Sequence, residues 1–388
     1  MPTIKDTLQQ ELHAIFVSAD NSAELTNQLD PKADDNQADQ ANVSAEVGEE
    51  SVAAMSLPAV LPAVGEPSTN GVRAQLVVNK SDEFFIAIAT KGVHSFVMLG
   101  NMHHGKPRIL ARVGKVAAQS SDSGCKIITK MVLLQTNAVL QEESIFPGGA
   151  ISYAAYSINF QQYLQFTKAI GVAMGEESIS CYQPLSEEID SLTLQYRQIA
   201  RVEKATEQDE HLIASTHGLS IANTCRHTAI DLIEYAQGNR LSANVSRVFF
   251  RNLPVKTTFD YGEPQDYFYV FPLPPGAYKV DGQKTAVLIK IYQRMENLLQ
   301  KDPYGENTIA KFEILKSLYI SQAGIAASGS LDDALANIRQ WKDENQDVIS
   351  QLRQQSFFGK IFTTQSGTQA MATEIEHDLL RMGAAISA

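Results

Sequence analysis

Cysteine is scarce in this sequence, and its scarcity excludes several kinds of site. The 388 residues include only three, Cys125, Cys181 and Cys225. They lie too far apart to form the Cys-x-x-Cys or mixed Cys/His spacings of structural zinc sites. A sparse, odd number of cysteines indicates reduced thiols, not a disulfide framework. We therefore expect no bound metal and no other cofactor.

Positive charge and long apolar runs are also scarce. Lys and Arg number 32 against 44 Asp and Glu, a formal net charge of −12, and no basic stripe is present that could bind nucleic acid. No apolar run approaches the roughly 20 residues of a membrane-spanning helix, and the first residues lack the pattern of a secretory signal peptide. We expect no nucleic-acid partner, no stable membrane insertion and no signal peptide.

The distribution of apolar and charged residues divides the chain into four regions. Residues 1–19 have apolar positions at helical spacing and predict a short helix. Residues 20–71 are acidic with few large apolar side chains, which is typical of a flexible linker. Residues 72–281 mix strand and helix patterns, and residues 282–388 are helical throughout. We expect an α+β domain followed by a helical C-terminal domain.

Individual elements can be placed from periodicity and turn residues. Strands are expected at 72–78, 84–89, 93–99, 109–113, 127–134, 152–157 and 267–271. Helices are expected from about 160 to 174, over 185–212 and 225–237, and over 286–299, 308–320, 331–353 and 370–382. Ser330 and Asp333 resemble a capping box at the start of the helix 331–353.

Cys225 is the cysteine whose position favours chemistry. Asn223 and Thr224 are both good N-cap residues, so Cys225 is expected on the first turn of a helix that ends at Gly238. Unpaired N–H groups and the positive end of the helix dipole favour a thiolate there and lower a thiol pKa from about 8.5. A helical cysteine can also be a small buried hydrophobic residue, and the sequence leaves both interpretations open.

A catalytic thiol needs a base, and His94 is the histidine best placed to supply one. It begins a predicted strand whose alternation puts His94, Phe96 and Met98 on one face. A helix N-terminus packed on that face can meet the imidazole. His227 is on the same helix as Cys225 but lies about 200° round its axis. His94 and Cys225 therefore form the candidate pair.

The group that would orient His94 is expected near the far end of the same strand. His103 and His104 follow at the turn into the next strand, and Asn101 stands just before them. The candidate catalytic residues are thus Cys225, His94, His103 and His104.

These stretches resemble one family of domains. Residues 94–100, followed by His103 and His104, are similar to the histidine strand and turn of circularly permuted papain-like domains of the NlpC-like and lecithin:retinol acyltransferase-like kind. Residues 223–229 resemble their later Asn-Cys helix start, except that Thr224 separates Asn from Cys. The order of histidine before cysteine is that of the permuted group. The resemblance covers about residues 72–280 and implies an antiparallel sheet packed on the Cys-bearing helix, with cysteine hydrolase or transferase chemistry.

More loosely, residues 108–115, 153–158 and 271–275 resemble secreted effectors of intracellular bacterial pathogens. This implies that a dedicated secretion system carries the protein into the host cytoplasm, where a host protein is its substrate or partner. Three functions remain open. They are a protease-, deamidase- or transglutaminase-type enzyme, an inactive papain-like protein that binds a host partner, and a thiol acyltransferase or lipase acting on a lipid.

Overall fold

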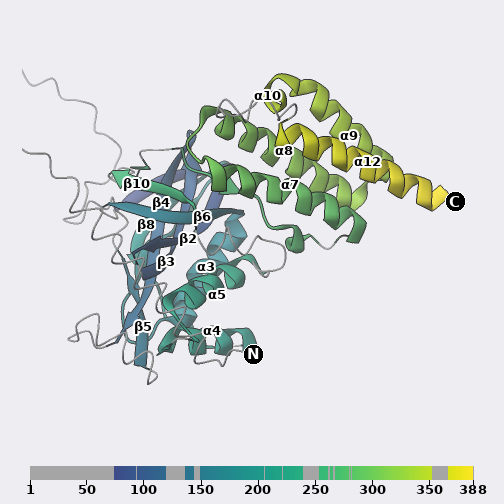
Figure 1. The fold of residues 1–388 in the computed structure, drawn as a ribbon. Helices are drawn as coiled ribbons and strands as arrows, with labels where there is room; N and C mark the ends of the chain where they lie inside the picture. Colours follow the sequence, from purple (N-terminus) through teal and green to yellow (C-terminus); the bar gives the residue numbers. More distant parts are fainter. Residues whose placement is uncertain are drawn as a thin grey trace, which may run out of the picture. The chain divides into compact units, whose positions relative to one another are not determined.

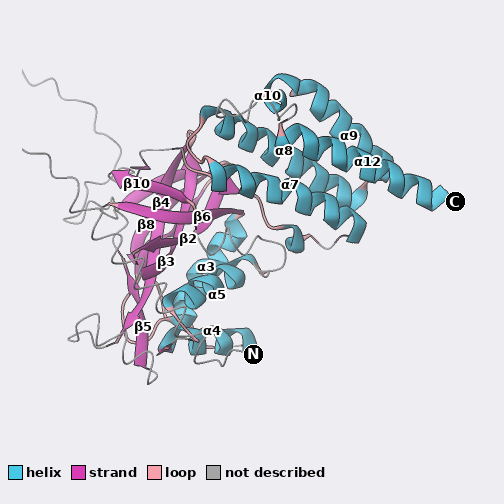
Figure 2. Ribbon diagram, viewed as in Figure 1, coloured by secondary structure: helices cyan, strands magenta, loops and turns pink. Residues whose placement is uncertain are grey.

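Antiparallel sheets precede a group of helices in this α+β structure, which is a computed structural model (Figure 1). Figure 2, coloured by secondary structure, shows the strands gathered together and the C-terminal helices grouped beside them. The structure describes residues 74–92, 94–118, 136–143, 149–204, 206–220, 222–238, 253–260, 263–264, 267–278, 280, 282–351 and 366–387. The expected N-terminal helix, the linker, the strand at 127–134 and Cys125 lie outside these residues.

The larger sheet has the strand order β11-β10-β6-β2-β3-β4-β5-β9. Its described neighbours pair antiparallel, and the short β12 pairs parallel with β6. The strands are β2 (Phe84–Lys91), β3 (His94–His103), β4 (Lys106–Ala117), β5 (Thr136–Glu142), β6 (Ala150–Ile158), β9 (Gly218–Leu219), β10 (Val255–Asp260), β11 (Glu263–Pro264) and β12 (Val270–Phe271).

Strand β2 is apolar on both faces because both faces are covered. Successive side chains of a strand point to opposite sides. Phe84 packs against Tyr163 of α3 (Phe160–Ala173), with ring centroids 5.4 Å apart, and Phe85 packs against Phe268, at 4.9 Å. This two-sided burial makes β2 and its neighbour β3 the centre of the core.

One sequence prediction is wrong where the chain forms a second, smaller sheet. Residues 185–212 were expected to be helical, but they belong largely to the hairpin of β7 (Ser180–Glu187) and β8 (Ser191–Gln198), which pairs with β1 (Gln75–Asn79). Only α4 (Glu207–His217) is helical there. Leu192 and Leu194 are buried at alternate positions, a strand period that the surrounding charged residues conceal. Pairing with β1, distant in sequence, stabilises the hairpin as sheet.

Helix α5 (Cys225–Gln237) packs against β3, β2 and β4, and α3 and α4 pack against α5. Its buried residues include Ala229, Leu232, Ile233 and Ala236, a stripe at helical spacing. The helix ends at Gly238, whose φ of 68° is the left-handed conformation that glycine adopts without strain. The expected helix at this place is confirmed.

The C-terminal part consists of packed helices, as predicted. The helix expected over 331–353 divides at Asn345, while the capping box of Ser330 and Asp333 is confirmed. The helices are α7 (Gly282–Lys301), α8 (Glu306–Ser328), α9 (Leu331–Glu344), α10 (Gln346–Ser350) and α12 (Gly367–Ser387).

These helices share one hydrophobic core with the sheet. Phe271 of β12 contacts Tyr292 of α7 and Phe312 of α8, with ring centroids 5.5 and 5.1 Å apart. An ion pair of 2.9 Å between Lys316 of α8 and Glu83, which precedes β2, adds a polar contact between the two regions. The helical region is therefore continuous with the α+β region in its packing.

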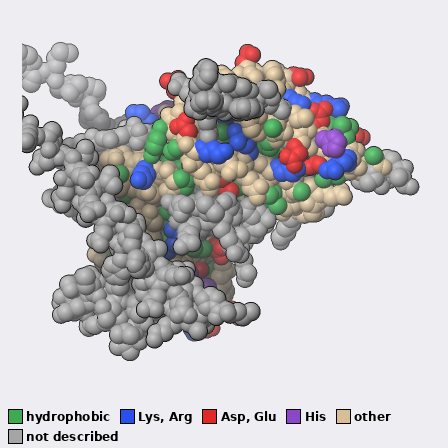
Figure 3. Space-filling model, viewed as in Figure 1, with side chains coloured by type: hydrophobic (Ala, Val, Ile, Leu, Met, Phe, Trp, Pro, Cys, Tyr) green, Lys and Arg blue, Asp and Glu red, His purple; other side chains and the backbone are tan. Residues whose placement is uncertain are grey.

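The exposed faces of the C-terminal helices carry charges of both signs. Figure 3 shows acidic and basic side chains interspersed on the visible face, with hydrophobic ones scattered between them. Ion pairs such as Lys342–Glu376, at 2.7 Å, join neighbouring helices there. Of the helices described, none combines the length and apolar character needed to cross a membrane.

Candidate active site

Cys225 is the first residue of α5, as the sequence predicts, and its side chain is half-buried. The backbone N–H of Ser95, in β3, donates to Cys225 Sγ at 3.4 Å. The neighbouring N–H of Arg226 also donates to the sulfur. The thiol thus lies where a helix N-terminus meets the start of the histidine strand.

His94 lies beside this thiol and hydrogen-bonds to it. Its Nε2 contacts the Glu143 carboxylate. The hydrogen bond with Cys225, followed by that with Glu143, raises the pKa of His94 to about 9 although burial opposes the charge. The imidazole is therefore held in its protonated form near neutral pH.

Opposing effects act on the pKa of Cys225. Burial is the largest single effect and raises it, but the hydrogen bonds from His94 and the Ser95 N–H, with the positive charge of His94, outweigh burial. The pKa is lowered overall. A lowered thiol pKa beside a raised imidazole pKa describes a thiolate–imidazolium pair, the arrangement of a nucleophilic cysteine.

Glu143, directly after β5, links His94 to a buried arginine. Its Oε2 lies 2.9 Å from Arg112 Nη2, and its backbone N–H donates to the Arg112 carbonyl at 2.9 Å. The Arg112 guanidinium in turn lies 3.9 Å from the ring centroid of Phe96. A carboxylate held in this way can orient the imidazole and stabilise its charge.

Gly114 leaves the space in which this contact forms. A Cβ atom at position 114 would lie 2.7 Å from His94 Nε2 and would overlap the Glu143 carboxylate outright. The contact between His94 and Glu143 therefore requires a residue without a side chain at position 114 of β4.

The structure does not bring His103 and His104 to the pair. His94 and His103 stand at opposite ends of the ten-residue strand β3, roughly 30 Å apart at about 3.3 Å per residue. His103 and His104 contact each other, and His103 Nδ1 lies 3.5 Å from Asp82. Asn101 also faces Asp82, donating at 2.8 Å. Glu143 occupies the orienting position expected of these residues.

His227 has a local role, in keeping with its expected direction away from the thiol. Its Nδ1 lies 2.8 Å from Thr224 Oγ1 and accepts from the Thr224 N–H at 3.3 Å. His227 therefore helps to cap α5. This places Thr224 as the N-cap residue directly before Cys225, so the residue inserted between Asn223 and Cys225 is what starts the helix.

Sequence reasoning missed Glu143, Arg112 and Gly114. Arg112 and Gly114 lie within residues 108–115, which were singled out only for their resemblance to effectors. Glu143 carries no motif, and its contact with His94 depends on β4 lying between β3 and β5. The one available signal was the presence of Arg and Gly at alternate positions within an otherwise apolar strand.

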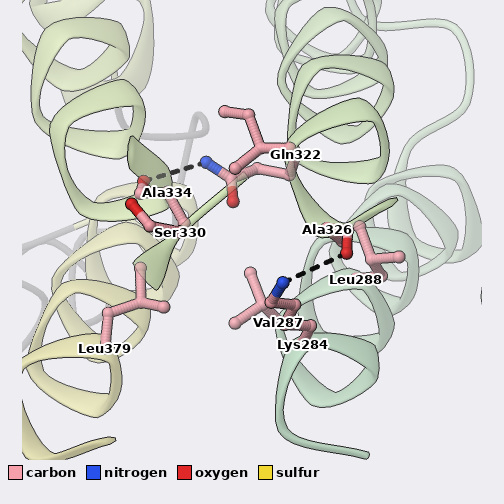
Figure 4. A pocket seen from close by; sticks show the side chains of 9 residues that line it. Lys284, Val287, Leu288, Gln322, Ala326, Ser330, Ala334 and Leu379 are labelled. Carbon is pink, nitrogen blue, oxygen red and sulfur yellow. Dashed lines mark hydrogen bonds between the residues drawn. The ribbon is translucent and has the colours of Figure 1, made fainter. Parts of the chain in front are cut away.

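A hollow lies among helices α7, α8, α9 and α12 (Figure 4). The space that it encloses is about 10 Å³, which holds no more than about one water molecule. Polar groups at its wall are already paired: Gln322 donates to the Ala334 carbonyl and Lys284 to the Ala326 carbonyl. The hollow is lined by neither cysteine nor histidine and offers no competing chemistry.

Within the described residues, no three or more His, Cys, Asp or Glu side chains gather in a way that could hold a metal ion. Comparisons of the chain with models of known protein families, with curated proteins and with solved structures found no match. What the site can do is therefore inferred from its own geometry.

Proposed function

We propose that the chain is a cysteine-dependent hydrolase or transferase with a permuted papain-like domain, in which Cys225, His94 and Glu143 act together. The observation that carries this proposal is that Cys225, His94 and Glu143 lie together: the N–H of Ser95, next to His94, donates to Cys225 Sγ, and His94 Nε2 contacts the Glu143 carboxylate. An antiparallel sheet packed on the Cys-bearing helix, with the histidine strand earlier in the chain, supports the permuted arrangement.

In the proposed reaction the Cys225 thiolate attacks an acyl carbon. A carbon–sulfur bond forms, and the carbonyl electrons move to the oxygen. The tetrahedral intermediate collapses as the bond to the leaving amine breaks, and protonated His94 gives its proton to that amine. Water then attacks the thioester as His94 removes its proton, and the carbon–sulfur bond breaks to release the acid and regenerate the Cys225 thiolate beside protonated His94. An incoming amine in place of water completes a transfer.

The developing oxyanion needs hydrogen-bond donors. As the first residue of a helix, Cys225 has a backbone N–H without an intrahelical acceptor. This N–H is at the N-terminus of α5, the positive end of the helix dipole, where negative charge is favoured. We assign it as one oxyanion donor. Glu143 keeps His94 oriented through each proton transfer.

For the substrate we propose a host protein, with the chain acting as a translocated bacterial effector. Host-cell extract is incubated with the intact protein or with Cys225→Ala, and extract proteins are compared by mass spectrometry. New chain ends indicate proteolysis, a gain of about 1 Da on glutamine indicates deamidation, and amine adducts indicate transglutamination. One of these changes is expected with the intact protein only.

Identical extracts after both treatments contradict the enzyme and favour a protein that only binds its partner. A thioester on Cys225 that hydroxylamine removes, without change in extract proteins, supports an acyl donor instead.

A further inference from the structure

A buried lysine lies behind the start of α5. Lys115 of β4 is only 3% exposed. Its Nζ donates to the carbonyls of Ser215 at 2.7 Å and Asn223 at 3.0 Å, to Asn223 Oδ1 at 3.0 Å and to Thr228 Oγ1 at 3.1 Å. Three ammonium hydrogens therefore serve four acceptors. Burying this charge is unfavourable unless such hydrogen bonds replace its lost water, so the residue's place is strongly determined.

The acceptors come from three segments around the cysteine. Ser215 is in the last turn of α4, where carbonyls lack a helical partner. Asn223 precedes Cys225 by two residues, and Thr228 follows on α5. The same segments are joined directly, because Thr228 Oγ1 donates to the Ser215 carbonyl at 2.8 Å. Asn223 Nδ2 also donates to the Ala214 carbonyl, at 3.3 Å. Lys115 thus joins the end of α4 to the start of α5.

The charge of Lys115 also acts on the thiol. Burial lowers the pKa of Lys115 to about 8, while the negative charges of Cys225 and Asp231 favour its protonated form. The attraction is mutual, so a protonated Lys115 favours the Cys225 thiolate. Asp231 is itself held by the Ser215 hydroxyl, which orients it within the same cluster.

We propose that Lys115 is a positioning residue for Cys225. Its ammonium fixes the segment between α4 and α5, so that the thiol meets His94, and its charge stabilises the thiolate from behind the helix. Only the use of that thiolate in catalysis rests on the proposed function.

The test compares Lys115→Met with Lys311→Met in the full chain. Lys311 of α8 is 5% exposed, and its Nζ donates to the Gln351 carbonyl, so it is a matched buried lysine in the helical region. Alkylation of Cys225 by iodoacetamide is followed from pH 5 to 10 by quantifying its peptide, and circular dichroism confirms folding. Lys115→Met is expected to raise the midpoint pH and slow alkylation at pH 6.5 by about tenfold, the equivalent of one pKa unit. Lys311→Met should leave both unchanged.

If Lys115→Met does not fold, Lys115→Gln retains two N–H donors and removes the charge, and the same upward shift is expected. A wild-type profile in either folded variant overturns the proposal, as does an equal shift in Lys311→Met. An unactivated Cys225 in the wild type, unaffected by His94→Ala, contradicts the proposed function. The further rise expected on losing Lys115 can still be measured in that case, so the two failures are distinguishable.

Discussion

Glu143, at the end of β5, holds His94 of β3 from across the one strand between them, β4. The residues are 49 apart in sequence, but β5 lies beside β4 and β4 beside β3, so that the end of β5 reaches the start of β3. Arg112, on the strand between them, pairs with the other oxygen of the same carboxylate. The orientation of the candidate base is thus a property of sheet register.

The first prediction concerns the thiol and its base. Because hydrogen bonding to His94 lowers the pKa of Cys225, iodoacetamide is expected to alkylate Cys225 in the wild type at a lower pH than it alkylates an ordinary thiol. His94→Ala should move the alkylation midpoint upward. His103→Ala, at the other end of the same strand, is the control and should match the wild type. Equal profiles in all three proteins would assign Cys225 a structural role.

A second prediction separates two adjacent carboxylates. Glu143→Gln removes the negative charge beside His94, so the pKa of His94 should fall. Because a less basic His94 stabilises the Cys225 thiolate less, alkylation of Cys225 at pH 6.5 should slow by up to about tenfold for each pKa unit that His94 loses. Glu142→Gln is the matched control, because Glu142 instead accepts from the Ser180 N–H at 2.6 Å and from the Tyr196 hydroxyl. An effect of the same size in both variants would argue for general damage to β5.

Gly114→Ala tests the steric requirement on β4. The added methyl group would displace the Glu143 carboxylate and His94, so we expect a loss of about 1–3 kcal/mol in the free energy of unfolding, as in overpacked cores, and a raised alkylation midpoint. Gly324→Ala, with open space in α8, should stabilise by about 0.5–1 kcal/mol. Chemical denaturation measures both. Unaltered His94 chemistry in folded Gly114→Ala would contradict the described packing.

The stability of the protein should depend on pH through His94. Its pKa rises from 6.5 to about 9 on folding, so the stabilisation is fully present below about pH 6.5 and is lost as pH rises through about 9. The melting temperature is measured from pH 6 to 10 for the wild type and Cys225→Ser. Removing the thiolate removes the largest cause of the shift, so the variant should lose its His94 stabilisation at lower pH. Coincident curves would indicate that the pair is not coupled.

The sequence predicts those parts of the site that depend on local signals. Cys225 follows two good capping residues, and Gly238 ends its helix, so that element could be placed from neighbours in the chain. The pairing of His94 with Cys225 needed the order of strand and helix as well. Glu143 could not be predicted, because its role arises only from the register of β3, β4 and β5. His103 and His104 were expected from their place at the turn that follows the histidine strand, but they lie at the far end of β3, away from the thiol.

The fold, like the site, could be predicted from the sequence where the signal is local. The C-terminal helices show an apolar period within single segments and were expected in the right places, except that the helix expected over 331–353 divides at Asn345. The hairpin of β7 and β8 was expected to be helical, because its charged residues conceal the alternation of Leu192 and Leu194, and its partner β1 is distant in sequence. Pairing between distant segments thus decides the elements that local pattern assigns wrongly.

The contact of Phe271 with Tyr292 and Phe312 has a consequence for how this chain can be divided. A fragment ending at residue 281 would keep Cys225, His94 and Glu143 but would expose the aromatic surface around Phe271 to water. The candidate enzyme therefore cannot be transplanted as a minimal module, and expression trials should retain α7 and α8. Recombination during evolution would meet the same boundary and would exchange sheet and helices together.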